Sequence, residues 1–107
     1  MEPEQELLNE LIRSIVESSH PRRIILFGSA ARGEMDADSD LDVLVIMPDG
    51  CDCLGTAQEL HCRLAGLGRA KDIVVVEEGD VIRHGDNPYL VIHTALLQGK
   101  ELYRAAS

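Results

Sequence analysis

The residues most able to do chemistry in this chain are Asp40 and Asp42, which precede and enter an apolar run that ends at Met47. Alternate residues of a strand point to one face and lie about 6.5–7 Å apart, so both carboxylates can reach one ion. Carboxylates this close repel each other unless they are protonated, solvated or bound to a cation. Their hard oxygens suit Mg²⁺ or Mn²⁺, which keep waters and hold substrate phosphates. The spacing indicates a divalent cation site, with a solvated acidic turn as the alternative.

A third acid, Asp72, begins the next apolar run, residues 72–76. A helix-length segment separates this run from the previous one, which predicts two parallel strands whose starting ends meet at one edge of the sheet. Asp40, Asp42 and Asp72 are therefore expected to converge there. Two divalent ions about 3.5–4 Å apart would stabilise both the attacking and the leaving oxygens of a phosphoryl or nucleotidyl transfer.

A phosphate-binding turn is predicted at Gly28 and Ser29, directly after the first apolar run. Gly28 has no side chain to block a phosphate, and the backbone N–H groups and hydroxyl around Ser29 can donate to its oxygens. Residues 29–34 can form one or two helical turns. Arg32 has two open interpretations, a bidentate contact to the same anion or an ion pair with an acid such as Glu34. A metal-bound nucleoside triphosphate is the substrate that unites these features.

The elements that must position these residues form an α/β domain. Too few residues separate the first two strands for a crossover helix, so these two strands are expected to be antiparallel. The expected sheet is therefore small and mixed, with three main strands, with or without a short fourth, and helices flank it. Leu102 and Tyr103 are expected to pack as a closing segment. Apolar periodicity and turn signals predict a helix over 4–18, strands over 24–27, 41–47 and 72–76, a helix over 54–67, a loop over 77–86 and a last helix over 87–99.

Composition narrows the class of protein. The 107 residues are expected to form a single domain, 1–107, with 45% hydrophobic residues to build a core. Ten Lys and Arg against 19 Asp and Glu give a net charge of −9, which argues against a direct nucleic-acid binder. Neither a secretory signal pattern nor a run of about 20 apolar residues is present, so a cytoplasmic protein that makes no membrane contact is expected.

The remaining candidates are weaker. Cys51 and Cys53 with His61 or Cys62 could hold a zinc ion, but a second matching pair is missing and reduced thiols are expected. Lys71 is expected to point away from Asp72. Arg83 and His84, placed in the predicted loop, are expected at the surface, with a reach toward nucleotide or partner as the alternative. 

A family resemblance rests on the same residues. Gly28-Ser29, ten residues, and then Asp40-Leu41-Asp42 match a Gly-Ser-x10-Asp-x-Asp signature. The fuller string GSAARG…SDLDVLV resembles the minimal nucleotidyltransferase group of the DNA polymerase beta-like superfamily. The KDIVVV and HTALLQGKELY segments also resemble that group, so the likeness extends over nearly the whole chain.

The resemblance implies a nucleotidyltransferase fold and a role for each motif residue. Asp40 and Asp42 would bind the metals, and Asp72 would help to hold a metal and activate the attacking hydroxyl. Gly28 and Ser29 would hold the triphosphate, with ATP as the expected substrate. Many members are antitoxins encoded beside a small helical HEPN toxin, and some transfer AMP to a tyrosine of that toxin.

Two other functions stay open from the sequence. One is a non-catalytic antitoxin that neutralises its partner by masking it. The other is nucleotidyl transfer to a small molecule, which usually requires a further substrate domain or a second subunit. A homodimer and a hetero-oligomer are both compatible with the sequence.

Overall fold

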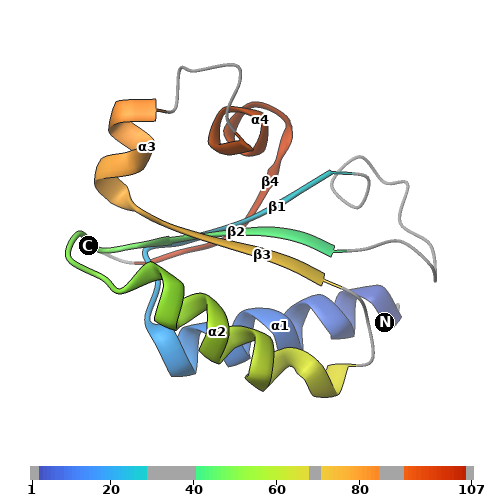
Figure 1. Cartoon of the computed structure of the whole chain (residues 1–107). Coiled ribbons are helices and arrows are strands. Elements are labelled where there is room, and N and C mark those ends of the chain that lie inside the picture. The colour runs from blue at the N-terminus through green and yellow to red at the C-terminus, as the bar shows by residue number, and fades with distance from the viewer. Residues whose placement is uncertain (1–2, 29–40, 68–70, 85–90, 106–107) are drawn as a thin grey trace.

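The computed structural model describes residues 3–28, 41–67, 71–84 and 91–105. Figure 1 shows the arrangement of their helices and strands. In chain order they are α1 (Pro3–Ser19), β1 (Arg23–Phe27), β2 (Leu41–Met47), α2 (Cys53–Leu64), a 3₁₀ turn η1 (Ala65–Leu67), β3 (Lys71–Glu77), α3 (Glu78–His84), α4 (Val91–Gln98) and β4 (Lys100–Arg104).

Within the described residues the strands form one mixed four-stranded sheet in the order β3-β2-β1-β4. β1 pairs antiparallel with β2 on one side and with β4 on the other, while β2 and β3 are parallel. The predicted antiparallel and parallel pairings are both confirmed. β4 completes the sheet as the short fourth strand and contains Leu102 and Tyr103, the predicted closing segment.

Helices cover both faces of the sheet, with α1 and α2 on one side and α3 and α4 on the other (Figure 1). Alternate residues of β2 divide between the two layers. Leu41, Val43 and Val45 pack in the core cluster with α1 and α2, while Leu44 and Ile46 pack in the second cluster with α4. β2 therefore reads as a continuous apolar run after Asp42, because both of its faces are covered.

The two helices of the first layer begin and end at recognisable residues. α1 stops where His20 adopts a left-handed φ of 51° and Pro21 follows. α2 is capped by Asp52, whose Oδ1 accepts a hydrogen bond from the Gly55 N–H at 3.1 Å. These helices meet at Leu11, Ile15, Leu60 and Leu64, which are fully buried.

The prediction of a loop over 77–86 is wrong for most of that segment, because Glu78–His84 form the helix α3. The first turn of this helix is stabilised from another part of the chain. Asp49, in the turn after β2, accepts a hydrogen bond from the Gly79 N–H at 2.8 Å, and Asp80 accepts one from the Glu77 N–H at 3.2 Å. The contact from Asp49 comes from 30 positions away and leaves no local signal, whereas the contact from Asp80 to Glu77 is a local one that the prediction overlooked. 

Within the described part of the chain, the helices are too short or too polar to cross a membrane.

Candidate active site

One edge of the sheet brings together the end of β1 and the starts of β2 and β3 (Figure 1). Phe27, the last residue of β1, is the antiparallel partner of Asp42. Asp42 is in turn the parallel partner of Asp72. Gly28 follows Phe27 directly, so three of the predicted site residues lie at neighbouring positions of one edge.

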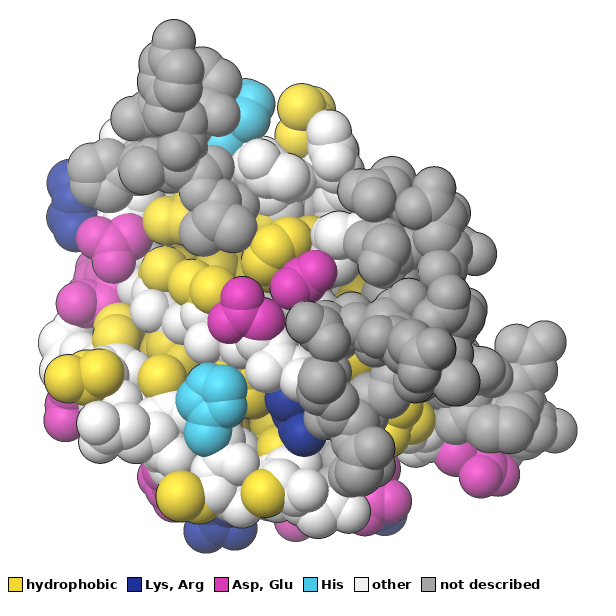
Figure 2. Space-filling model, turned by 45° about the vertical axis from the view of Figure 1, so that its right-hand side comes forward, with side chains coloured by type: hydrophobic (Ala, Val, Ile, Leu, Met, Phe, Trp, Pro, Cys, Tyr) yellow, Lys and Arg dark blue, Asp and Glu magenta, His cyan; other side chains and the backbone are white. Residues whose placement is uncertain are grey.

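The two carboxylates also share one face of the sheet. Asp42 alternates with Leu41 and Val43, so its side chain lies on the α4 side together with Leu44. Asp72, as its in-register neighbour, lies on the same side. Asp42 is half-buried and Asp72 is exposed. Figure 2 turns this edge toward the viewer and shows acidic side chains beside hydrophobic ones on the described surface.

Gly28 is required at this edge for two reasons. Its φ of +75° lies in the left-handed region that side chains rarely adopt. A Cβ at this position would also overlap with a carboxylate oxygen of Asp42 and lie 3.2 Å from its Cγ. The backbone after β1 thus packs directly against the carboxylate, and any other residue would displace one of them.

The charge arrangement favours a cation. Neighbouring strands are about 5 Å apart, and two ionised carboxylates at that distance repel by roughly 1 kcal/mol in water and about 3 kcal/mol at an effective dielectric constant of 20. Among the residues that the structure describes, no group of three or more His, Cys, Asp and Glu is placed to hold a metal. Mg²⁺, however, is commonly held by one or two carboxylates together with substrate phosphates and waters. Asp42 and Asp72 fit that mode of binding.

Several predicted site residues lie outside the described residues: Ser29, Arg32 and Asp40, together with the helical turns predicted over 29–34. Lys71 is the strand partner of Leu41, so its side chain lies on the sheet face opposite to Asp42 and Asp72. This is the orientation predicted for the residue before Asp72. Arg83 belongs to α3, where its Nη2 donates to Asp80 Oδ1 at 2.7 Å. Its side chain is 63% exposed, which agrees with the surface interpretation.

Cys51 and Cys53 follow the end of β2 and lie at the end of the sheet opposite to this edge. The Cys51 Sγ is 3.3 Å from Thr56 Oγ1, and Cys53 is the first residue of α2. A helix N-terminus ordinarily lowers the pKa of a thiol. Here burial, the neighbouring Cys51 and the acids Glu77 and Asp80 dominate, and they raise the pKa of Cys53 from 9.0 to about 11. Cys53 is therefore a protonated thiol at neutral pH.

A second feature was missed by the sequence reasoning. A hollow of about 260 Å³ at the opposite end of the sheet is lined by Arg22, Arg23, Glu78, Arg104 and Ala105. Its only sequence signal is the adjacent pair Arg22 and Arg23, the second of which is the first residue of β1. Arg104 joins them because β4 pairs with β1, with Arg23 opposite Arg104, and that pairing was not predicted.

Comparisons with known proteins agree with this fold. A family model described as a nucleotidyltransferase domain matches residues 8–85. A solved structure described as that of a minimal nucleotidyltransferase shares 29% identity with a TM-score of 0.64, over 90% of this chain and 89% of the other. A chain of a toxin–antitoxin complex solved with AMP-PNP shares 25% identity with a TM-score of 0.59, over 90% of this chain and 73% of the other.

A third similar structure shows the fold alone. It is a complex of a tri-AMPylated HEPN toxin from Shewanella oneidensis with its MNT antitoxin, at 23% identity and a TM-score of 0.57, over 94% of this chain and 72% of the other. No curated protein matches the chain. The family match spans more than half of the sequence and includes the edge that carries Gly28, Asp42 and Asp72. This chain therefore belongs to the nucleotidyltransferase domain family.

Proposed function

We propose that this chain transfers a nucleotidyl group from ATP to a hydroxyl of a partner protein, with Mg²⁺ or Mn²⁺ held by Asp40, Asp42 and Asp72. The observation that carries the proposal is that Asp42 and Asp72 are in-register neighbours, and that Asp42 packs against the backbone of Gly28. Two carboxylates on one face supply hard oxygen ligands, and the glycine beside them has no side chain to keep a phosphate from the backbone N–H groups.

Each residue has a defined task in this proposal. Gly28 and Ser29 hold the triphosphate through backbone N–H groups and the hydroxyl, and Arg32 contacts the same phosphates. The divalent ion, when bound, neutralises charge on the phosphates as the reaction proceeds. Asp72, exposed at the edge, receives the proton of the attacking hydroxyl.

The reaction is a displacement at the α-phosphorus. The oxygen of the acceptor hydroxyl bonds to that phosphorus, and the bond from phosphorus to the oxygen bridging the α- and β-phosphates breaks. Pyrophosphate leaves with the electron pair of that bond, and AMP remains attached to the acceptor. Asp72 holds the proton released from the hydroxyl until solvent removes it.

The architecture and the similar structures support a protein acceptor. The described residues form one sheet with two helical layers, and residues 1–107 are proposed to fold as a single domain. We propose that the acceptor supplies its own surface to the reaction. Two chains 25% identical to this one belong to toxin–antitoxin complexes, one solved with AMP-PNP and one an MntA–HepT mutant. The proposed partner is accordingly a HEPN-type toxin that this chain neutralises by AMP transfer in the cytoplasm.

The test is transfer of label from [α-³²P]ATP, in the presence of Mg²⁺, to the product of the adjacent gene. Wild type is expected to label that protein, and Asp42→Asn is expected to lose labelling by about a hundredfold or more. Glu59→Gln, an exposed acid of α2 outside the site, is the control and should keep wild-type labelling. Equal labelling by wild type and Asp42→Asn would refute the proposal.

The same variant separates the other two functions. If Asp42→Asn neutralised the partner in cells as well as wild type does, masking of the partner would replace nucleotidyl transfer as the mechanism. If label passed to a small hydroxyl compound and not to the partner, the acceptor class would be wrong.

A further inference from the structure

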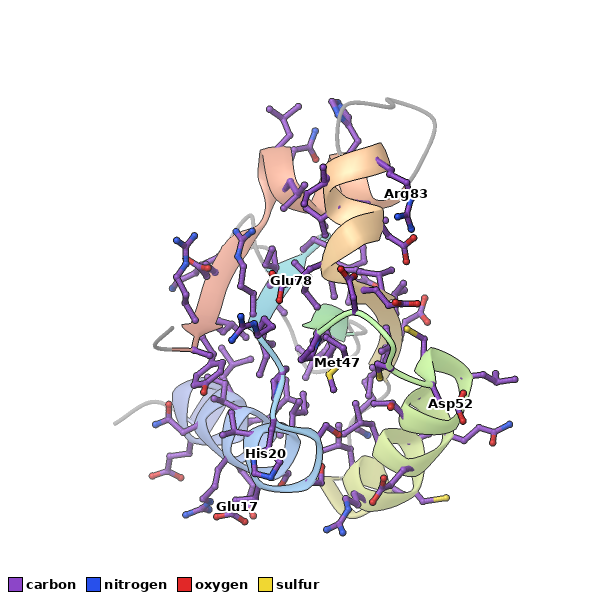
Figure 3. All side chains as sticks on the ribbon, turned by 90° about the vertical axis from the view of Figure 1, so that its left-hand side faces the viewer. Glu17, His20, Met47, Asp52, Glu78 and Arg83 are labelled. Carbon is purple, nitrogen blue, oxygen red and sulfur yellow. The ribbon has the colours of Figure 1, made fainter. Side chains whose placement is uncertain are left out.

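The hollow at this end of the sheet is lined by three arginines, Arg22, Arg23 and Arg104, in a chain that is acidic as a whole. It adjoins a second hollow of about 210 Å³, and the two share Arg22, Arg23 and Glu78. Figure 3 views the molecule from this end, with Glu78 at the start of α3 near the middle of the view. We call the two hollows together the arginine face.

Three guanidinium groups meet two carboxylates on this face. Arg22 Nε donates to Glu78 Oε1 at 2.6 Å. Arg23 Nε and Arg104 Nε both donate to Glu101 Oε1, at 2.8 and 2.9 Å. The hydrogen bonds from Arg104 and Arg23 lower the pKa of Glu101 below its ordinary value, which keeps it ionised. One positive charge thus remains in excess, in a chain whose net charge is −9.

The arginines retain donors for a further acceptor. A guanidinium has five N–H groups, and these three bonds each use the Nε–H. The Nη groups can therefore bind one more carboxylate without breaking the existing pairs. Arg104 is the most accessible of the three, with 64% of its side chain exposed.

The second hollow adds an apolar surface beside these charges. Its lining includes Ile46, Val81 and Ile82 together with the shared arginines. Ile82 is 83% exposed, the most exposed of the large hydrophobic side chains in the described residues. An exposed isoleucine beside an open hollow gains free energy when a partner covers it. A small inorganic anion would use the arginines and leave this apolar part uncovered.

The arginine face is placed to hold an acceptor without covering the catalytic edge. Arg23 is the partner of Ile46 at one end of the β1–β2 pair, and Phe27 is the partner of Asp42 at the other. Asp42 and Ile46 are four positions apart in β2, which corresponds to about 13 Å. Ile46 and Asp42 also lie on the same face of the sheet. A protein bound at Ile82 can therefore extend to the carboxylates.

We propose that the arginine face docks the acceptor protein, through a segment in which a carboxylate side chain lies next to an apolar one. The carboxylate binds Arg22 and Arg104, and the apolar side chain fills the hollow beside Ile82. Charge complementarity and the adjoining apolar hollow select this occupant. The inference rests on the proposed function, since it gives the acceptor of that reaction a second contact away from the reacting atoms.

The test separates docking from transfer by measuring both. Binding of the adjacent gene product is measured by calorimetry without ATP, and labelling is measured with ATP and Mg²⁺. Ile82→Ser is expected to weaken binding about tenfold. Arg104→Gln is expected to weaken it several-fold and to reduce its dependence on salt. 

The chain offers matched controls for both variants. Leu54 is 71% exposed on α2, so Leu54→Ser removes a similar apolar side chain from another surface. Arg63 Nε pairs with Glu59 at 3.2 Å within α2, so Arg63→Gln removes the same charge from a similar ion pair. Both controls should bind the partner as wild type does. Circular dichroism melts verify that all four variants are folded.

The outcomes distinguish this inference from the proposed function. Weakened binding by Ile82→Ser and Arg104→Gln, with unchanged controls, supports the docking surface. Labelling by wild type together with equal binding by all variants overturns the docking surface and leaves the proposed function standing. Binding that depends on the arginine face, without any labelling, supports docking and refutes AMP transfer. Failure of the partner to bind overturns the docking surface.

Discussion

Replacement of Gly28 by alanine tests the close approach between the backbone and Asp42. The substitution has two consequences that can be measured separately. At a φ of +75° an alanine is strained, which is expected to reduce the free energy of unfolding by about 1–2 kcal/mol. The new Cβ also overlaps with a carboxylate oxygen of Asp42 and must push that side chain aside.

The second consequence should dominate the activity. A displacement of a catalytic group by about 1 Å can reduce the rate about a hundredfold. Gly28→Ala is therefore expected to lose about a hundredfold of labelling from [α-³²P]ATP at a temperature where it is still folded. Urea denaturation gives the change in unfolding free energy, and labelling of the partner gives the change in activity.

Gly50 provides the matched control. Its φ of +91° imposes a similar strain, but a Cβ there would meet no atom within 4 Å. Gly50→Ala is expected to lose about 1–2 kcal/mol of stability and to keep its activity. If Gly28→Ala and Gly50→Ala lost stability equally and both remained active, the packing of Gly28 on Asp42 would have no catalytic role and the reasoning would be refuted.

Three further perturbations test other parts of the account. Asp72→Asn should abolish labelling of the partner. It should also raise the free energy of unfolding, measured by urea denaturation, by about 0.2–1 kcal/mol, because it removes repulsion from the in-register neighbour Asp42. A lower free energy of unfolding would contradict this. At pH 8, Cys53 should react with iodoacetamide about tenfold more slowly than exposed Cys62, measured by mass spectrometry, because its raised pKa of about 11 lowers its thiolate fraction by more than the higher basicity raises its nucleophilicity; equal rates would contradict the raised pKa. Asp52→Ala should reduce the free energy of unfolding by about 1 kcal/mol, because the Gly55 N–H loses its acceptor; an unchanged urea midpoint would count against the cap.

The parts of the fold that the sequence predicted are those set by local pattern. The strand over Leu41–Met47 was predicted with the bounds that the structure has, because an apolar run between acids and a Pro-Asp-Gly turn is unambiguous. The parallel arrangement of β2 and β3 followed from the helix between them. These two features were enough to predict that Asp42 and Asp72 lie at one edge.

The errors arose where distant residues act together. α3 was predicted as a loop because the local cap from Asp80 was overlooked and the second cap comes from Asp49, 30 residues before Gly79. The arginine face was missed because Arg104 reaches Arg23 only through the β1–β4 pairing. Helical period and strand alternation report on neighbours in sequence, so contacts of this kind leave no pattern to read.

The central claim is that a divalent ion and a triphosphate bind at the edge where Gly28, Asp42 and Asp72 meet. Paramagnetic broadening of backbone amide signals by Mn²⁺, with AMP-PNP present, measures this directly in solution. We expect the amides of those three residues to broaden first, those of Ile46 and Arg104 to broaden least, and the effect to disappear in Asp42→Asn. Broadening that began at the arginine face, or that persisted unchanged in Asp42→Asn, would contradict the claim.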